Sequence, residues 1–354
     1  MPTLDILTHT RRGFFMMHLA GFELYRRELL RDLGLETRVV EYAGREGLRR
    51  GLGECRGDAA MVVTDWSWTT EELAGAFRGA RGSGRKLVYF DCFDQTSTPY
   101  LGLLPDVDLY LKAKMLAPRG AYLREYRGGY VVTDALAKGG MDLSGWTFGS
   151  VADPAYLDRL EPGWSFGYSR RIRWLLRFNR LAPHPWRLRD LDLHARFSPP
   201  QRDNQEWYEQ YRARAFDAAE RLRGAMRVTP PQRVSMRKYY LEMRRCRMVF
   251  SPFGWGELCL RDYEAAAAGC VLLKPDMGHV RTSPDIFEAG VTYAPVAWDF
   301  SDLERVCEGL RSRPEEARSI AAAGQQRLAA ALEGGGFVRD VGRVLGRLGL
   351  KAHR

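Results

Sequence analysis

Short apolar runs alternate with longer segments of mixed polarity through the first third of the chain. These runs are rich in β-branched and aromatic side chains, a composition that favours buried strands. The strands predicted in this part are Leu4–Thr8, Thr37–Tyr42, Ala59–Thr64, Lys86–Asp91 and Asp108–Lys112. Helical stretches are predicted between them, at Phe22–Leu33 and Glu71–Arg78. Strands that alternate with helices predict a parallel, doubly wound α/β sheet.

The same alternation starts again in the second half of the chain. Strands are predicted there at Leu188–Phe197, Met226–Val228, Met248–Ser251, Cys270–Leu273 and Thr292–Val296. Helices are predicted at Glu206–Leu222, Ser235–Arg245 and Glu315–Leu332. The intervening residues 117–165 are rich in Gly, Tyr and Asp, which is typical of loops or of a hairpin near a domain junction.

Two such units in succession predict an α/β protein with two Rossmann-like, doubly wound domains that face a cleft. We place the first domain at residues 1–165 and the second at residues 188–333. A basic aromatic crossing segment, 166–187, joins them, and residues 334–354 are expected to form a C-terminal helix or tail.

Length and composition agree with this organisation. The chain has 354 residues, of which 45% are hydrophobic, and this is enough for two cores. It has neither an apolar run of the roughly 18 residues that span a bilayer nor a basic-then-apolar signal pattern at its start. Its six cysteines are scattered and form no CxxC pair, which favours reduced core thiols. These features predict a cytoplasmic protein.

The formal net charge of +10 predicts a surface that attracts polyanions. Because neither zinc-finger spacing nor an RNP-type aromatic motif is present, no nucleic-acid partner is expected. Diphosphate ligands and anionic lipid headgroups remain as candidates for this charge.

Residues 248–276, MVFSPFGWGELCLRDYEAAAAGCVLLKPD, carry the densest chemical signal. An apolar strand runs into the turn Gly254-Trp255-Gly256, whose glycines let the backbone bend sharply and approach a ligand. A helix is predicted to begin at this turn. Its first N–H groups and its dipole would favour an anionic group.

Charged side chains follow the turn at helical spacing. Glu257, Arg261 and Glu264 stand at i, i+4 and i+7, so we expect all three on one helical face. Gly269 then ends the helix, and Lys274 stands at the carboxyl end of the next strand. An ordinary βαβ unit with a solvated charged face is the alternative. The combination of glycines, carboxylates and cations favours a nucleotide-sugar site.

The stretch SPFGWGELCLRDYEAAAAGCVLLKPD resembles the C-terminal donor domain of GT-B fold glycosyltransferases, in the glycosyl transferases group 1 family. TYAPVAWDFSDLERV and EEARSIAAAGQQRLAAAL resemble the tail of the same domain. The resemblance covers about residues 188–333 and is densest over 248–299. In the N-terminal half only the strand–helix alternation agrees, so its role as the acceptor domain is an analogy.

The resemblance implies roles for individual residues. It implies that Glu264 holds the ribose hydroxyls of the donor. Many retaining members have a glutamate eight residues earlier, where this chain has Gly256 beside Glu257, so the stereochemical outcome stays open. Arg196, which follows the first strand of the donor domain, and Lys274 are candidates to bind the diphosphate. The expected donor-binding set is Arg196, Gly254, Trp255, Gly256, Glu257, Arg261, Glu264 and Lys274.

The resemblance also implies a metal-independent reaction with no cofactor besides the nucleotide-diphosphate sugar as co-substrate. A metal-dependent glycosyltransferase of the other major fold would instead need an Asp-x-Asp at a strand end. The chain has two such triplets, Asp106-Val107-Asp108 and Asp190-Leu191-Asp192. Because triplets this short are common by chance, no metal site is predicted.

Acceptor chemistry would come from the N-terminal half, at the carboxyl edge of the predicted sheet. If the enzyme inverts, a base there must deprotonate the acceptor hydroxyl. The candidate bases follow predicted strands and are His9, Asp65, Asp91 and Asp94. Each is alternatively a structural loop residue, and a retaining enzyme needs no such base.

Residues 164–189 contain seven arginines and no acidic side chain. Arg170, Arg173, Arg177 and Arg180 share one helical face, and apolar residues occupy the others. This pattern is typical of a helix on an anionic membrane surface, although an interdomain crossing helix would show it too.

The sequence thus favours a glycosyltransferase that moves a sugar from a nucleotide-diphosphate sugar to a glycan or a lipid-linked acceptor. It would be cytoplasmic, with the inner face of the membrane as a candidate location. A non-catalytic protein that binds nucleotide or carbohydrate is the main alternative. An NAD-type oxidoreductase is less favoured, because Cys259 stands where the last glycine of Gly-x-Gly-x-x-Gly belongs.

Overall fold

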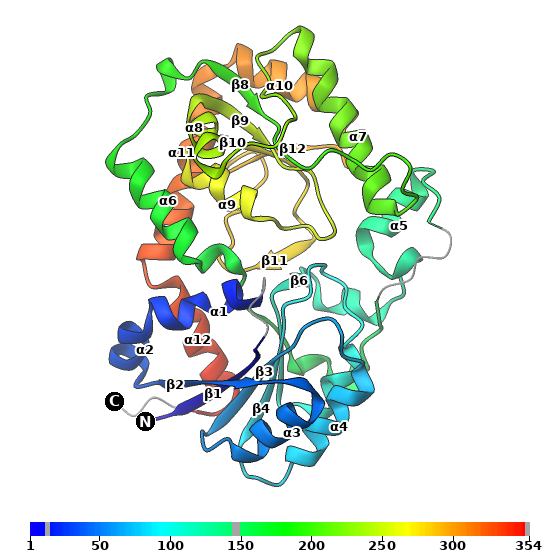
Figure 1. The fold of residues 1–354 in the computed structure, drawn as a ribbon, viewed down its shortest axis with the longest axis vertical. Helices are drawn as coiled ribbons and strands as arrows, with labels where there is room; N and C mark the ends of the chain where they lie inside the picture. Colours follow the sequence, from blue (N-terminus) through cyan, green and yellow to red (C-terminus); the bar gives the residue numbers. More distant parts are fainter. Residues whose placement is uncertain (11–14, 144–148, 351–354) are drawn as a thin grey trace.

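The computed structural model describes residues 1–10, 15–143 and 149–350, and in it the chain forms two α/β halves (Figure 1). The N-terminal half has a parallel six-stranded sheet in the order β2-β1-β3-β4-β5-β7. Its strands are β1 Thr3–His9, β2 Glu36–Tyr42, β3 Ala59–Val63, β4 Lys86–Asp91, β5 Leu109–Lys112 and β7 Leu160–Pro162. Its helices are α1 Phe15–Leu24, α2 Arg26–Leu33, α3 Gly44–Glu54, α4 Thr70–Ala80 and α5 Val131–Lys138.

The C-terminal half has a parallel four-stranded sheet in the order β12-β10-β9-β8. Its strands are β8 Leu191–His194, β9 Cys246–Phe250, β10 Val271–Pro275 and β12 Ala294–Val296. The remaining helices are α6 Arg170–Leu181, α7 Trp207–Arg221, α8 Met236–Arg245, α9 Leu260–Ala267, α10 Leu303–Ser312, α11 Pro314–Glu333 and α12 Gly336–Arg347. The predicted fold class, two doubly wound sheets, is confirmed.

Local predictions were wrong in a few places. The strand predicted at Met226–Val228 is only an isolated bridge between Val228 and Leu193. The helix predicted at Phe22–Leu33 is broken at Tyr25 into α1 and α2. Strand β7 and helix α5 lie in the segment for which loops were expected, of which residues 144–148 fall outside the described part.

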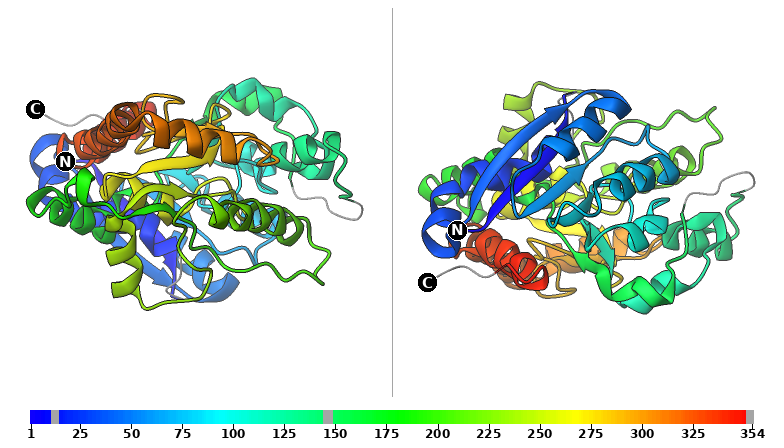
Figure 2. Two further views of the ribbon diagram at one scale, coloured as in Figure 1. Left: turned by 90° about the horizontal axis from the view of Figure 1, so that it is seen from above. Right: turned by 90° about the horizontal axis from the view of Figure 1, so that it is seen from below.

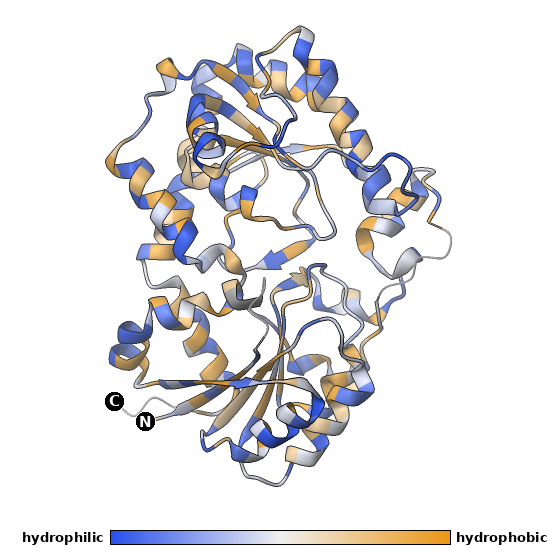
Figure 3. Cartoon of the chain, in the orientation of Figure 1, coloured by the Kyte–Doolittle hydropathy of each residue, from blue (hydrophilic) through white to orange (hydrophobic). Residues whose placement is uncertain are grey.

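The strands of the N-terminal sheet bury side chains on both faces, and this explains why they read as apolar runs. Ile6 and Met61 join a core with α1, α2 and α12, whereas Leu7 and Val62 join a second core with α3 and α4. Figure 3 shows the apolar residues gathered along the strands of both sheets and the polar ones on outer helix faces.

A small antiparallel sheet joins the two halves. Strand β6, Lys114–Leu116, follows the N-terminal sheet and pairs with β11, Val280–Thr282, which follows β10. The first core also continues across this junction, because it includes residues of both halves. The carboxyl edges of the two large sheets therefore meet at one seam.

Helix α12 returns from the C-terminal half and packs on the N-terminal half, beside α2 (Figure 2). Its anchor is Phe337, which is fully buried and lies 5.2 Å from the rings of both Phe22 and Trp164. Gly21 makes room for this ring, because a Cβ there would come within 2.4 Å of it. The segment expected as a C-terminal helix or tail is thus a helix up to Arg347, and residues 351–354 lie outside the described part.

We predict that Phe337→Ala lowers the free energy of unfolding by about 3–5 kcal/mol, because it removes a buried aromatic side chain that links the halves. Urea unfolding followed by circular dichroism measures this loss. The exposed neighbour Arg339→Ala serves as the control and should change stability by less than about 0.5 kcal/mol. A loss below about 1 kcal/mol for Phe337→Ala would show that α12 does not hold the halves together.

Candidate functional site

Strand β9 and the turn Gly254–Gly256 that follows it lie at the seam between the halves. Helix α9 starts later than the sequence predicted. Helix α9 begins at Leu260, because the Asp262 side chain caps it by accepting from the backbone N–H of Cys259 at 2.9 Å. Gly254–Leu258 therefore form a loop. The prediction that Glu257 shares a helical face with Arg261 and Glu264 is wrong, since Glu257 precedes the helix.

Glu257 is fully buried where the two halves touch. Its carboxylate accepts from Thr96 of the N-terminal half, from the backbone N–H at 3.1 Å and from Oγ1 at 2.5 Å. His279 Nε2 lies 3.4 Å away on the other side. Burial raises the pKa of Glu257, but the neighbouring His279, followed by Thr96 and Tyr130, lowers it further, so the net direction is downward.

The neighbouring Gly256 is the residue that the close contact requires. A Cβ at this position would lie 1.9 Å from the backbone oxygen of Asp94. Gln95 Nε2 donates to the backbone oxygen of Trp255 at 3.0 Å in the same contact. Glycine in the place where many retaining relatives have glutamate is therefore explained sterically by the segment at Asp94.

Asp262 and Lys274 form a fully buried ion pair with a Nζ–Oδ2 distance of 3.0 Å. Ser251 Oγ donates to the same carboxylate at 2.6 Å. Lys274, expected at the diphosphate, thus neutralises the carboxylate that caps α9. The sequence analysis missed Asp262, although an acidic residue three positions after Cys259 is a signal for a capping box.

Glu264 lies on α9 facing α6 and α8. It accepts from the hydroxyls of Tyr239 at 3.0 Å and Tyr240 at 2.8 Å, and it pairs with Arg171 Nη2 at 2.6 Å. It also borders a cavity of 330 Å³ whose other lining includes Trp174 and apolar residues of α6 and α8. Glu264 is therefore close to a cavity, with its oxygens held by neighbouring hydroxyls.

Two arginines stand at the carboxyl edge of the C-terminal sheet, and they differ in their partners. The guanidinium of Arg196 is fully engaged within the protein. It pairs with Glu242 through two contacts of 2.5 and 2.9 Å, and it donates to the backbone carbonyls of Pro230 and Gln232. Among the described residues Arg261 has weak contacts to Ser251 Oγ at 3.4 Å and to the sulfur of Cys259, and its guanidinium lies 5.8 Å from the ring centre of Phe197.

The Nε atom of Arg261 is buried and has no acceptor among the described residues. A buried N–H donor without an acceptor costs free energy, and a bound anion would supply the missing acceptor. Its position after β9 and at the start of α9 is where parallel α/β sheets bind phosphate groups.

His194 lies at the end of β8, near Arg261 and Arg196. Its ring is buried, 4.8 Å edge-on from that of Tyr239. Burial, followed by the charges of Arg261 and Arg196, lowers the pKa of His194 to about 3. Burial is thus the main reason why the neutral form of His194 is favoured, and the two arginines add to it.

Two of the candidate bases lie at the seam. Asp91 is buried and accepts from Tyr110 Oη at 2.7 Å, with Lys112 Nζ 3.5 Å away. Asp94 touches the motif loop and pairs with Lys114 Nζ at 2.6 Å. Lys112 and Lys114 are fully buried, and neither was among the predicted site residues. Nothing in their local sequence distinguishes them from ordinary strand residues.

The other two candidate bases follow β1 and β3 along the same sheet edge. His9 lies against the ring of Tyr42, with 5.6 Å between ring centres. Asp65 closes its own loop, since its carboxylate accepts from the backbone N–H of Ser67 at 3.0 Å. Neither has a contact with the motif loop among the interactions found in the described residues.

The two Asp-x-Asp triplets are occupied by structural contacts. Asp106 pairs with Arg78 at 3.2 Å, and Asp192 with Arg247 at 3.0 Å. Within residues 1–10, 15–143 and 149–350, no group of three or more His, Cys, Asp or Glu side chains is placed to hold a metal ion.

The sequence model of a family described as glycosyl transferase-like matches residues 189–332. The C-terminal half is a glycosyl transferase-like domain. A search among curated proteins finds no relative. The matched segment contains β8, β9, α9 and β10, and therefore the whole C-terminal side of the site.

Solved structures extend the likeness over both halves. The chain is similar to HepE from Anabaena in complex with UDP-glucose, at 13% identity, with 98% of this chain and 100% of that chain covered and a TM-score of 0.50. It is also similar to a glycosyltransferase from Rickettsia africae, at 6% identity, with 98% of each chain covered and a TM-score of 0.53. These similarities confirm the predicted GT-B fold. The matched model of residues 189–332 agrees with the predicted class, glycosyltransferase.

We predict that acid destabilises the glycosyl transferase-like domain through His194. Its ordinary pKa is 6.5 and its pKa in the fold about 3, so between these values the unfolded chain binds the extra proton. The free energy of unfolding should therefore fall as the pH drops below 6.5, by up to about 1.4 kcal/mol per pH unit from this group.

Chemical unfolding between pH 7 and 4 measures this slope. His194→Gln should reduce the slope, and His184→Gln, at a more exposed position, should leave it as in the wild type. Equal slopes for all three proteins would contradict the assignment.

Proposed function

We propose that the protein transfers a sugar from a nucleotide-diphosphate sugar to a glycan or a lipid-linked acceptor. The observation that carries this proposal is the buried Nε of Arg261, which lacks an acceptor at the start of α9. It stands in a glycosyl transferase-like domain, at the edge of the sheet where such an anion is expected. The structure of HepE contains UDP-glucose, which supports a nucleotide-sugar as the donor.

In this proposal the leaving diphosphate lies between Arg261 and the N–H groups of the loop from Gly254 to Leu258. Guanidinium and N–H donors held in place before the reaction stabilise the charge that develops as the sugar–phosphate bond breaks. We therefore propose that the transfer needs no metal ion. Arg196 and Lys274 act indirectly, because their charges are paired with Glu242 and Asp262.

Glu264 is proposed to bind the ribose hydroxyls. In the described structure its oxygens accept from Tyr239 and Tyr240, so the sugar hydroxyls would replace these phenolic donors one for one. Such an exchange keeps the buried carboxylate hydrogen-bonded in both states.

The acceptor side and the stereochemistry belong to the proposal as well. If the enzyme inverts, Asp94 is the best placed of the four candidate bases, because it touches the motif loop and is part-exposed. If the enzyme retains, Asp94 instead helps to shape the seam. The proposal also includes the domain limits. The N-terminal domain is 1–165, the crossing segment 166–187, the C-terminal domain 188–333 and the C-terminal helix 334–354.

We predict that one nucleoside diphosphate among UDP, GDP, TDP and ADP raises the melting temperature, with or without Mg²⁺. The Kd should weaken at least tenfold in Arg261→Ala, because a charge-assisted contact to the phosphates is lost. Glu264→Gln should weaken it less. The control is Arg305→Ala, at an exposed site in the same half, which should bind as the wild type does.

The binding assay, together with a measurement of sugar release from sugar nucleotides, separates the alternatives. Stabilisation by NAD alone would contradict the transferase and favour an oxidoreductase. Binding of a diphosphate without release of sugar from any sugar nucleotide would favour a non-catalytic binding protein. Binding that survives unchanged in Arg261→Ala would place the ligand elsewhere.

We also propose that the protein is cytoplasmic and binds anionic lipid through α6. Among the described residues no helix is long and apolar enough to cross a membrane. Ile172, Leu175 and Leu176 of α6 are core, as the crossing-helix alternative expected. Trp174 and Leu181, however, are 59% and 83% exposed on the outside of the same helix.

Arginines surround this outward apolar strip. Trp174 stacks on Phe178 at 5.3 Å, and Arg244 of α8 lies over the Phe178 ring at 4.7 Å. Arg177 and Arg237 have no ion pair among the described residues, so their charges are available to lipid phosphates. Exposed aromatic side chains with unpaired arginines favour insertion at a lipid headgroup boundary.

We predict that the protein sediments with vesicles of phosphatidylglycerol and phosphatidylcholine but less with pure phosphatidylcholine. Reversing two charges in R177E/R237E should weaken binding at least tenfold, since each basic residue near an anionic surface contributes about 1 kcal/mol. The matched control is R50E/R56E in the N-terminal half. Equal binding of both variants would contradict a membrane face on α6.

A further inference from the structure

A second cavity lies on the C-terminal half, at the amino end of its sheet and so opposite to the carboxyl edge where Arg261 lies. Its volume is 640 Å³, a size typical of small-molecule sites. It opens beside Asp192 and Arg247, which are near the amino ends of β8 and β9. About 13 Å of strand β9 separates Arg247 from Ser251 at the carboxyl edge.

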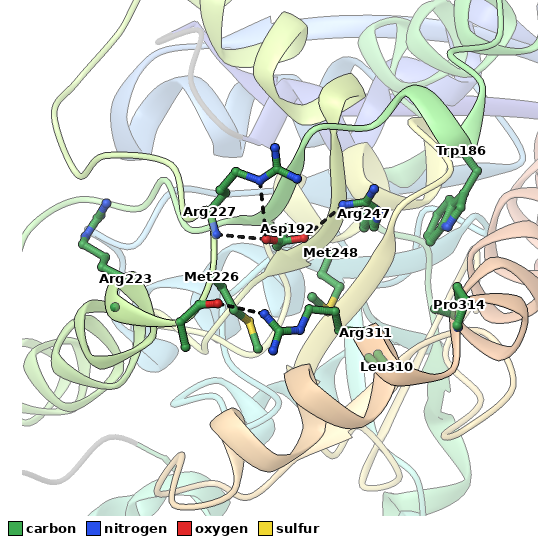
Figure 4. A pocket seen from close by; sticks show the side chains of 13 residues that line it. Trp186, Asp192, Arg223, Met226, Arg227, Arg247, Met248, Leu310, Arg311 and Pro314 are labelled. Carbon is green, nitrogen blue, oxygen red and sulfur yellow. Dashed lines mark hydrogen bonds and ion pairs between the residues drawn. The ribbon is translucent and has the colours of Figure 1, made fainter.

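Four arginines from separate segments line this cavity (Figure 4). Arg223 comes from the turn after α7, Arg227 from the loop before α8, Arg247 from β9 and Arg311 from α10. Arg223 and Arg227 are four positions apart, but Arg247 and Arg311 are distant from them in the sequence, so no local motif indicates the group. In the view of Figure 4 all four arginines lie to the left of Trp186 and Pro314.

Two of the four arginines are neutralised. Arg223 pairs with Glu220 at 2.8 Å and donates to the carbonyls of Val228 and Thr229. Arg247 pairs with Asp192 at 3.0 Å. Their positions are therefore set by internal contacts.

The charges of the other two arginines are not balanced. Arg227 is 65% exposed, and its Nε lies 3.9 Å from a carboxylate that already pairs with Arg247. Arg311 donates to the backbone oxygen of Ala225 at 2.8 Å and has no carboxylate partner among the described residues. Both residues line this cavity, and a doubly charged phosphate group would balance their two charges.

The rest of the lining is apolar or aromatic. Met226, Met248 and Leu310 contribute hydrocarbon and sulfur surface. Trp186 forms a wall, and its indole Nε1 is buried without an acceptor among the described residues. An inorganic anion would leave this surface and this donor unused, whereas an organic phosphate would use both.

We infer that this cavity binds a small organic phosphate with an apolar or aromatic part. This site is separate from the donor site proposed around Arg261. Arg227 and Arg311 hold the phosphate, and Trp186 with the methionine side chains holds the organic part. The inference does not depend on the proposed transferase reaction, because it uses none of the residues proposed to bind the donor.

Phenyl phosphate, inorganic phosphate and phenol serve as probes in isothermal titration calorimetry. Phenyl phosphate should bind at one site, inorganic phosphate more weakly, and phenol not measurably. R227A/R311A should weaken phenyl phosphate at least tenfold. R214A/R305A, which removes two exposed arginines of the same half, should leave the affinity unchanged.

Trp186→Leu distinguishes a built site from general charge attraction. It should weaken phenyl phosphate several-fold and leave inorganic phosphate as in the wild type. Arg261→Ala should change neither. No binding by the wild type, equal binding by R227A/R311A, or loss of binding in Arg261→Ala would each overturn the inference. The melting temperature of each unliganded variant shows whether it is folded.

Discussion

The buried carboxylate of Glu257 is the interaction on which the site depends. A charge taken out of water must be paired and hydrogen-bonded, and its removal from these partners is costly. Thr96 supplies the hydrogen bonds from the N-terminal half, and His279 lies on the C-terminal side. The motif loop is therefore fixed against the other half, and Gly256 permits the approach to Asp94.

A second buried pair fixes the start of helix α9. Asp262 caps α9 and is neutralised by Lys274, so the helix begins at Leu260 and Gly254–Leu258 stay outside it. Arg261 follows the capped position and keeps a buried Nε donor without an acceptor among the described residues. Lys274 and Arg196, which the sequence suggested for the phosphate, are paired with Asp262 and Glu242 instead.

The fold was predictable from the sequence because its strands are buried on both sides. Runs such as Ala59–Val63 carry the signal within themselves, and the resemblance over 248–276 located the glycosyl transferase-like half. The candidate site was only partly predictable. Helical spacing placed Arg261 and Glu264 on one helix, but the place of Glu257 depends on Thr96, which is distant in the sequence.

Long-range packing explains the other omissions. The two buried lysines at the seam look like ordinary strand residues until Asp91 and Asp94 are placed beside them. The return of α12 depends on the space that Gly21 leaves for Phe337. The four arginines around the second cavity come from three distant parts of the chain, at 223–227, 247 and 311, so only the folded chain brings them together. Spacing within one element carries no information about such contacts.

The central claim is that a nucleoside diphosphate binds at the seam, against the start of α9. Hydrogen–deuterium exchange with and without the stabilising diphosphate tests it most directly. The account predicts slower exchange in 251–264 and in the contacting segment 94–96, with no change around Arg227 and Arg311. Protection confined to other segments, with 251–264 unchanged, would contradict the account.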